Sequence, residues 1–353
     1  MNHPSILSIG TATPKHAVNQ SQAAEIACAS LEDAGSVRRV QALFRRAGVD
    51  RRGSVLADKD GSQSFYMPGQ SVPSTAERME QYRDHARLLA IQAAKSALSR
   101  AAVDPSSITH LVTASCTGFD SPGPEQDLIG ELGIPVCVRR TNIGFMGCHA
   151  AINALSVAEA FVRAEPTARV LICCVELCTL HLSHTSDPGR QVAHALFADG
   201  AAASVIANSS AAAQIRRTGS MMIPDSRDQM SWRVGDHGFE MSLSPQVPGT
   251  LARSVPPWIA TFLASEGFAP GCIGSWAIHP GGPRLLSTLT AALELPHDAC
   301  AISRDVLRRH GNMSSATVLF ILEALLKENA LKPILALAFG PGLAGEAVLL
   351  DQS

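Results

Sequence analysis

The sequence has 353 residues, which is too long for a single small core and suggests two domains or one duplicated unit. It is 46% hydrophobic and 17% charged, a composition that favours a well-buried α/β body. The formal net charge of −2 provides no general electrostatic attraction to nucleic acid or to an anionic membrane, so neither is an expected partner.

The cysteines and the N-terminal residues predict a cytoplasmic protein. The nine cysteines are an odd number and lack the spacing of a disulfide framework, which favours reduced thiols. The first residues show no secretory signal, and no apolar run approaches the roughly 20 residues that cross a bilayer. We therefore expect a protein of the cytoplasm with no membrane segment.

Strands and helices are predicted to alternate along the chain. The first third is predicted to contain a strand at 6–12, a polar helix at 20–48, a loop at 53–74 and an amphipathic helix at 75–101. A strand at 108–116, a helix at 125–132 and a strand at 136–142 follow. This alternation favours parallel sheets covered by helices.

Two later segments have the same pattern. Cys148 and Asn312 each begin a predicted helix, and a buried strand follows each helix, at 169–175 and at 333–339. The separation of 164 positions (312 minus 148) also aligns Ser115 with His279, and both residues end a strand. Agreement of three elements predicts an internal duplication with halves at 1–209 and 210–353.

Three residues in this duplicated pattern could carry chemistry. Cys148 begins a helix, where unpaired N–H groups and the helix dipole are expected to lower the pKa of a thiol, although most cysteines are structural. His279 ends an apolar strand before a Gly-rich turn, at the sheet edge where α/β proteins bind ligands. Asn312 could simply cap its helix, but the duplication would direct it toward Cys148.

Four blocks of sequence resemble the type III polyketide synthases, the chalcone synthase-like family. The blocks are Gly147-Cys148, Ile278-His279-Pro280-Gly281-Gly282-Pro283, Gly311-Asn312-Met313-Ser314-Ser315-Ala316 and Phe339-Gly340-Pro341-Gly342-Leu343, and the similarity covers nearly the whole chain. The resemblance implies an α/β thiolase fold, in which duplicated αβα halves form a five-layer αβαβα sandwich. It also implies a homodimer and no metal or organic cofactor.

The resemblance assigns a reaction to the three residues. Cys148 would accept an acyl starter from acyl-CoA, and malonyl-CoA would lose CO₂ to form an enolate. His279 and Asn312 would donate hydrogen bonds to the thioester oxygen during decarboxylation. Repeated Claisen condensation and cyclisation would then give a phenolic or pyrone product.

Further residues match the family with less specificity. The matched pocket residues are Phe197, Phe239, Cys116, Cys178, His181, Ser314, Gly340, Pro341 and Gly342. Arg39 and Arg46 match positions that hold the phosphates of CoA, although a run of arginines is often only a solvated helix face. Five departures from the plant members leave the starter and the product open: His149 replaces Phe, Ser121 replaces Met, and Cys116, Cys178 and His181 replace Thr.

Two other functions fit parts of the sequence. An initiating ketoacyl-acyl carrier protein synthase shares the Cys, His and Asn, but its His is typically followed by Gln-Ala-Asn instead of Pro280-Gly281-Gly282. The spacing of Cys178, His181 and His184 resembles a zinc site of a hydrolase, but a strand would direct residues three apart to opposite faces. We expect no metal.

Overall fold

The computed structural model describes residues 3–29, 31, 33–63, 65, 71–183, 185, 187–210 and 213–351. The helices are α1 (Gln20–Cys28), α2 (Ala34–Arg46), α3 (Thr75–Ala101), α4 (Pro124–Leu132), α5 (Ala150–Ala164), α6 (Pro188–Leu196), α7 (Val247–Ala264), α8 (Pro283–Ala292), α9 (Ala301–His310) and α10 (Ala316–Lys327). The strands are β1 (Pro4–Ala12), β2 (Ala17–Asn19), β3 (Arg51–Gly53), β4 (His110–Ser115), β5 (Arg139–Gly144), β6 (Arg169–Leu177), β7 (Asp199–Asn208), β8 (Ala213–Met222), β9 (Met230–Gly235), β10 (Gly238–Leu243), β11 (Ser275–Ile278), β12 (Ile334–Gly340) and β13 (Ala344–Asp351).

The main sheet repeats one strand pattern twice. Its nine strands have the order β11-β12-β13-β8-β1-β7-β6-β4-β5. In the first half β4 pairs in parallel with β6, and β6, β7 and β1 continue antiparallel. The second half repeats this with β11, β12, β13 and β8, and only two residue pairs between β1 and β8 join the halves. The topology therefore contains the duplication that the sequence predicts.

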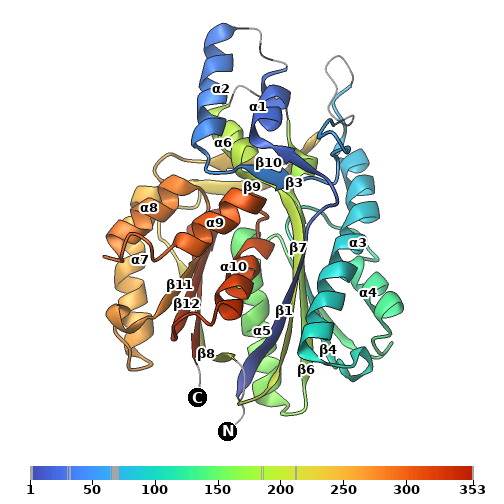
Figure 1. The fold of residues 1–353 in the computed structure, drawn as a ribbon, viewed down its shortest axis with the longest axis vertical. Coiled ribbons are helices and arrows are strands. Elements are labelled where there is room, and N and C mark those ends of the chain that lie inside the picture. The colour runs from blue at the N-terminus through green and yellow to red at the C-terminus, as the bar shows by residue number, and fades with distance from the viewer. Residues whose placement is uncertain are drawn as a thin grey trace.

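Helices lie on both sides of the sheet (Figure 1). Alternating side chains of each half-sheet pack into two different hydrophobic clusters. In β6, Ile172 packs toward the central helices α5 and α10, whereas Leu171 packs under α3. In β12, Ala336 packs toward the same central helices, whereas Leu335 packs toward α7 and α8. The five layers are α3 with α4, one half-sheet, α5 with α10, the other half-sheet, and α7 with α8.

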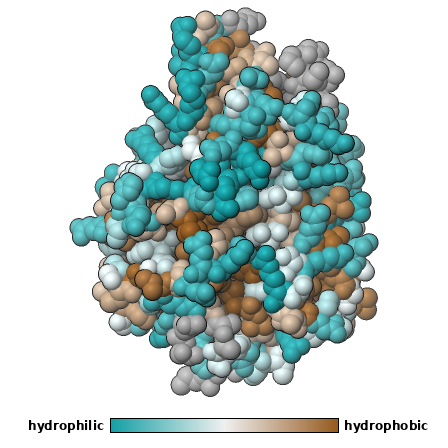
Figure 2. All heavy atoms as spheres, in the orientation of Figure 1, coloured by the Kyte–Doolittle hydropathy of each residue, from teal (hydrophilic) through white to brown (hydrophobic). Residues whose placement is uncertain are grey.

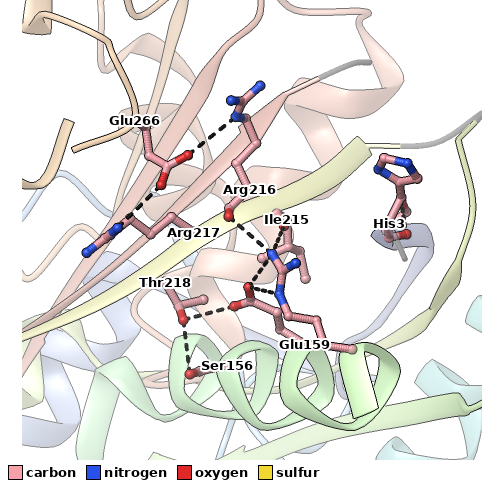
Figure 3. A network of polar contacts seen from close by, with 10 residues as sticks. His3, Ser156, Glu159, Ile215, Arg216, Arg217, Thr218 and Glu266 are labelled. Carbon is pink, nitrogen blue, oxygen red and sulfur yellow. Dashed lines mark hydrogen bonds and ion pairs between the residues drawn. The ribbon is translucent and has the colours of Figure 1, made fainter. Parts of the chain in front are cut away.

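A polar network holds α5 against β8 at the far end of the central layer (Figure 3). Arg163 pairs with Glu159 on α5 and donates to the carbonyls of Ile215 and Arg216 on β8. The Thr218 hydroxyl donates to the same Glu159 carboxylate at 3.0 Å. Because Cys148 precedes the other end of α5, this network is separated from it by about 20 Å of helix.

Two expectations about the elements are wrong. The single helix predicted at 20–48 is two helices, because Asp33 caps a new helix by accepting from the Ser36 N–H at 2.7 Å. The sheet is mixed instead of parallel, because β7 and β13 return antiparallel beside β6 and β12. In the part of the chain that the structure describes, no helix is both long and apolar enough to cross a membrane.

Candidate active site

Cys148, His279 and Asn312 line one cavity of about 570 Å³. Its walls come from α2, α6, the β9–β10 hairpin, the start of α7 and the turn before α8. The volume is in the usual range for small-molecule sites, roughly 300–1,000 Å³. Most of the lining is apolar, including Val192, Leu196, Phe197, Met230, Met241, Leu243, Val247, Pro248, Leu285 and Phe339.

Cys148 lies in a 3-10 turn, Gly147–His149, that leads directly into α5. Gly147 has a φ of +78°, and a Cβ there would come within 2.4 Å of the Pro341 ring. The turn therefore requires glycine. The Ser314 hydroxyl donates to the Cys148 sulfur at 3.5 Å, which connects the start of α5 to the segment before α10.

The expectation of a lowered pKa for the Cys148 thiol is wrong. Burial raises its pKa to about 12, and the negative charge of the Glu176 carboxylate adds to this, although the Ser314 hydrogen bond opposes it. The resting nucleophile is therefore a thiol, and a base must remove its proton when it reacts.

His279 follows β11 and is fixed through its backbone, since its N–H donates to the Leu337 carbonyl at 2.8 Å. The side chain is 2% exposed, and neither ring nitrogen has a hydrogen-bond partner among the described residues. Burial, with a smaller effect of nearby His149, lowers the pKa of His279 to about 3. At neutral pH the ring is uncharged and offers one N–H donor and one lone pair to the cavity.

Asn312 is held between the end of α6 and the start of α10. Its N–H donates to the Leu196 carbonyl at 2.8 Å, and its carbonyl accepts from the Ala198 N–H at 2.9 Å. The side-chain Oδ1 accepts from the Ser314 N–H at 2.9 Å. Because Oδ1 is engaged there, the Nδ2 amide is the part of the side chain that is available as a donor.

Two other predicted site residues also line this cavity, Phe197 and Arg46. Arg39 is not among the lining residues, and its Nη2 donates to the Ser36 hydroxyl on α2 at 2.6 Å. Hydrophilic side chains cover much of helix α2 in Figure 2, as expected for a solvated helix face. The cavity therefore includes one of the two arginines that the sequence nominates.

The remaining predicted pocket residues do not line the cavity. Cys116, Cys178, His181, Phe239 and Ser314 are each at most 5% exposed. The Ser314 hydroxyl lies 3.1 Å from the Cys116 sulfur as well as beside Cys148. These side chains form a packed wall next to the cavity.

His181 is the centre of that wall. Its ring stacks on Phe239 with centroids 4.0 Å apart and meets Trp232 edge-on at 5.4 Å. Nδ1 accepts from the Phe239 N–H at 2.9 Å, and Nε2 donates to the Thr117 carbonyl at 2.6 Å. Both ring nitrogens are therefore occupied, and burial lowers the pKa of His181 to about 3.

Gly340, Pro341 and Gly342 lie against the turn that carries Cys148. A Cβ on Gly340 would meet the His149 ring at 2.4 Å, so the two segments are in close contact. His149 itself lies 2.7 Å from the Asn153 side-chain oxygen through Nδ1. This glycine loop supports the Cys148 turn and is not part of the cavity lining.

The metal alternative has no support in the described residues. No group of three His, Cys, Asp or Glu side chains among them could hold a metal ion. His184 lies outside the described residues, and His181 already uses both nitrogens.

Sequence reasoning missed three features of the site. Arg284 lines the cavity together with Arg46, and it directly follows the His279-Pro-Gly-Gly-Pro block, which was the available signal. Met230 and Met241 form one wall from a hairpin that the sequence did not predict. Glu176 is buried next to the wall and accepts from the Cys116 N–H at 3.0 Å and the Thr117 hydroxyl at 2.7 Å.

Comparison with known proteins gives the family directly. Residues 2–210 match the model of the N-terminal domain of chalcone and stilbene synthases, and residues 214–352 match the model of the C-terminal domain. The chain is 32% identical to an alpha-pyrone synthesis polyketide synthase-like protein, Pks18, of Mycobacterium tuberculosis, over 98% of this chain and 90% of that protein. It is 31% identical to 1,3,6,8-tetrahydroxynaphthalene synthase of Streptomyces peucetius, over 98% of this chain and 92% of that protein.

Solved structures agree. The fold matches PKS-I of the brown alga Ectocarpus siliculosus with a TM-score of 0.95 and 26% identity, over 100% of this chain and 99% of that one. It matches the type III polyketide synthase domain of Steely1 from Dictyostelium with a TM-score of 0.92 and 26% identity, over 99% of both chains. The chain therefore belongs to the chalcone and stilbene synthase family, and it is a type III polyketide synthase, a decarboxylating condensing acyltransferase with the thiolase fold that acts on CoA thioesters.

Proposed function

We propose that Cys148 carries the growing acyl chain, while His279 and Asn312 bind the thioester oxygen of malonyl-CoA. The observation that carries this proposal is the meeting of the three side chains in one cavity. A thiol, a neutral imidazole and a carboxamide supply the nucleophile, the base and the donors that the reaction needs.

The first step loads the starter. The neutral His279 ring acts as the general base and takes the proton of Cys148 as the sulfur attacks. The sulfur attacks the carbonyl carbon of the acyl-CoA thioester, the C–S bond to CoA breaks, and the CoA thiolate leaves with the proton from His279. The acyl group is then bound to Cys148 as a thioester.

The second step forms the carbon–carbon bond. Malonyl-CoA loses its carboxylate as CO₂, and the electron pair moves into an enolate whose oxygen accepts hydrogen bonds from His279 and Asn312. The enolate carbon attacks the Cys148 thioester, the C–S bond to Cys148 breaks, and a β-ketoacyl-CoA forms. Reloading of this product on Cys148 allows further extension, and closure of the chain gives a phenolic or pyrone ring.

The substrates are an acyl-CoA starter and malonyl-CoA, and the chemistry needs no metal or organic cofactor. Arg46 lines the cavity, which supports a role for it in binding a phosphate of CoA. The apolar lining favours an aliphatic or aromatic acyl group over a charged one.

The packed wall of His181 and Phe239 is proposed to limit the space for the growing chain. Neither residue lines the cavity, and their stacked rings lie 4.0 Å apart. A small side chain at position 181 would open room between Thr117 and Phe239, so this wall is expected to determine chain length.

Assembly as a homodimer is proposed from the free edge of the sheet. Strand β5 ends the sheet order, and Phe119, Phe145 and Met146 near it are 55%, 37% and 40% exposed. Large exposed apolar side chains beside an unpaired strand edge fit pairing with a second copy. Phe119 and Phe145 also contact Phe239, with ring centroids at 5.8 and 5.4 Å, so the interface would adjoin the site.

Two further assignments are proposed with the function. The nine cysteines are all free thiols, which supports a cytoplasmic location. The repeated strand pattern supports two thiolase-like halves at 1–209, with the Cys, and at 210–353, with the His and Asn.

Replacement of the nucleophile tests the proposal. The Cys148→Ala variant, incubated with a panel of acyl-CoAs and labelled malonyl-CoA, should form neither an acyl-enzyme nor a condensed product by mass spectrometry. The exposed thiol Cys137 provides a matched control, and Cys137→Ala should behave like the parent. Condensation at the parent rate in Cys148→Ala would refute the assignment.

A further inference from the structure

Helix α6 ends inside the protein without a C-terminal glycine. The residue after its last turn, Phe197, has an extended backbone, with φ −73° and ψ 148°. The last four carbonyls of a helix have no partner within the helix, and a buried carbonyl without a donor costs about 1–3 kcal/mol. The end of α6 therefore needs donors from elsewhere in the chain.

Five donors meet this need, and one of them is the Gln20 side-chain Nε2, which donates to the Ala195 carbonyl at 3.0 Å. The Ala193 carbonyl accepts from the Phe197 N–H at 2.9 Å, and the Leu196 carbonyl accepts from the Asn312 N–H at 2.8 Å. Arg52 donates to the two carbonyls between them, from Nη1 to His194 at 2.6 Å and from Nη2 to Ala195 at 2.7 Å. Arg52 Nη1 also donates to the Phe197 carbonyl at 2.9 Å. One guanidinium thus donates to three carbonyls within the last turn of α6 and the residue that follows it.

The Arg52 side chain is fixed by its burial and by its neighbours. Its side chain is 2% exposed, lies over the Phe44 ring at 5.7 Å and is near the buried carboxyl of Asp199. A cation at a helix C-terminus is also stabilised by the helix dipole. The planar guanidinium fits carbonyls that are spread along the chain, because its donors are on separate nitrogens in a rigid fork, whereas the three donors of a lysine ammonium are on one nitrogen.

The segment that Arg52 holds is paired with Asn312. Phe197 and Asn312 form a parallel backbone bridge, and Asn312 exchanges hydrogen bonds with Leu196 and Ala198. The fit is close, since a Cβ on Gly311 would lie 2.8 Å from the Ala198 Cβ and 3.4 Å from the Arg52 Cβ. Any shift of the end of α6 would move both Phe197 and the Asn312 carboxamide.

We propose that Arg52 is a positioning residue that fixes the orientation of the Asn312 carboxamide and of Phe197 by closing the C-terminal end of α6. This inference rests on the proposed role of Asn312 as a donor to the thioester oxygen. Arg52 does not line the cavity that holds Asn312, so it acts only through the backbone.

The test compares decarboxylation with thiol reactivity. In Arg52→Met, kcat for malonyl-CoA decarboxylation without a starter should fall about tenfold or more, because small displacements of a donor have large effects on rate. KM for malonyl-CoA should change less than about threefold, since the arginine does not face the substrate. Alkylation of Cys148 by iodoacetamide should stay within about twofold of the parent, because Cys148 lies on a different element. Arg52→Lys keeps the positive charge but not the two separated nitrogens that reach the carbonyls, so its kcat should lie between those of the parent and of Arg52→Met.

A double-mutant cycle separates positioning from general damage. In an Asn312→Ala background, Arg52→Met should add little further loss of decarboxylation, because the group that it positions is absent. Arg163→Met is the matched control: it removes another arginine that donates to two backbone carbonyls, those of Ile215 and Arg216, and should leave kcat unchanged.

Three results would overturn the inference: unchanged kcat in Arg52→Met, full additivity with Asn312→Ala, or a parallel loss of decarboxylation and alkylation. If Arg52→Met does not fold, the Arg52→Lys variant decides by the same criteria. A parent protein that does not decarboxylate malonyl-CoA would instead refute the proposed function.

Discussion

His279 and Asn312 differ in how their side chains are held. The Asn312 carboxamide is oriented by the Ser314 N–H, whereas the His279 ring has no hydrogen-bond partner among the described residues and is fixed by burial and by its backbone. A buried polar ring without a partner is costly in the resting protein. That cost is recovered when a substrate oxygen accepts from the ring.

We expect His279→Ala or Asn312→Ala to slow malonyl-CoA decarboxylation by about 10²-fold, since each removes one donor to the enolate oxygen. Release of labelled CO₂ measures the rate. Cys148→Ala serves as the control, because decarboxylation does not use the thiol and should persist. Unchanged rates in both donor variants would contradict their role.

The protonation state of Cys148 gives a second prediction at this scale. With a pKa of about 12, only a small thiolate fraction exists near neutrality, and this fraction grows tenfold for each pH unit. The rate of Cys148 alkylation by iodoacetamide should therefore rise about tenfold per unit between pH 7 and 9. A plateau in this range would indicate a preformed ion pair with His279 instead.

At the scale of the element, the sequence predicted some helices and strands and missed others. Helix α3 has the predicted bounds, because its apolar residues recur at helical spacing. Strand β7 was not predicted, because its Asp-Gly-Ala-Ala-Ala start has low strand propensity and is stabilised only by pairing with β1 and β6.

The site residues were also predicted only in part from the sequence. The sequence predicted Cys148, His279 and Asn312 because each sits at the end or start of a recognisable element. It could not predict that His181 is engaged by the backbone of Phe239 and Thr117, since those contacts join segments far apart in the chain. Nor could it separate Arg46, which lines the cavity, from Arg39, which does not.

The meeting of α2 and α8 at the cavity predicts where the phosphates of CoA bind. Arg46 ends α2 and Arg284 begins α8, and both line the cavity. Replacing either by Ala should raise KM for malonyl-CoA about fivefold, as expected for loss of one partly solvated charge contact. KM for malonyl-pantetheine, which lacks phosphate, should not change.

Arg45 provides the control, since it is exposed on the same turn of α2 and does not line the cavity. Arg45→Ala should keep the parent KM for both substrates. An equal rise of KM for malonyl-pantetheine in the Arg46 or Arg284 variants would mean that these arginines do not contact phosphate.

At the scale of the whole molecule, buried histidines make the fold sensitive to acid. Burial lowers the pKa of His181 and of His279 to about 3, from an ordinary value of 6.5. Below pH 6.5 the unfolded chain therefore binds more protons than the folded chain, so stability falls as pH falls. Each histidine should contribute about 1.4 kcal/mol of loss per pH unit toward its folded pKa.

Urea unfolding at pH 7.0 and pH 5.0 measures this effect. The parent should lose several kcal/mol of unfolding free energy between these values. In His181→Phe, which cannot titrate, the loss should be smaller by about 2 kcal/mol. Equal losses in the parent and in this variant would show that His181 does not set the acid sensitivity.

The repeated strand pattern places the two helix starts within one polypeptide instead of in two identical subunits. A pair of identical subunits would carry the same residue at both symmetry-related positions, so a change at one would be imposed on the other. Covalent linkage of the repeats removes this constraint. One repeat can therefore carry a thiol at Cys148 while the other carries an amide at Asn312. The cavity thus receives two different functional groups from equivalent positions of the two repeats.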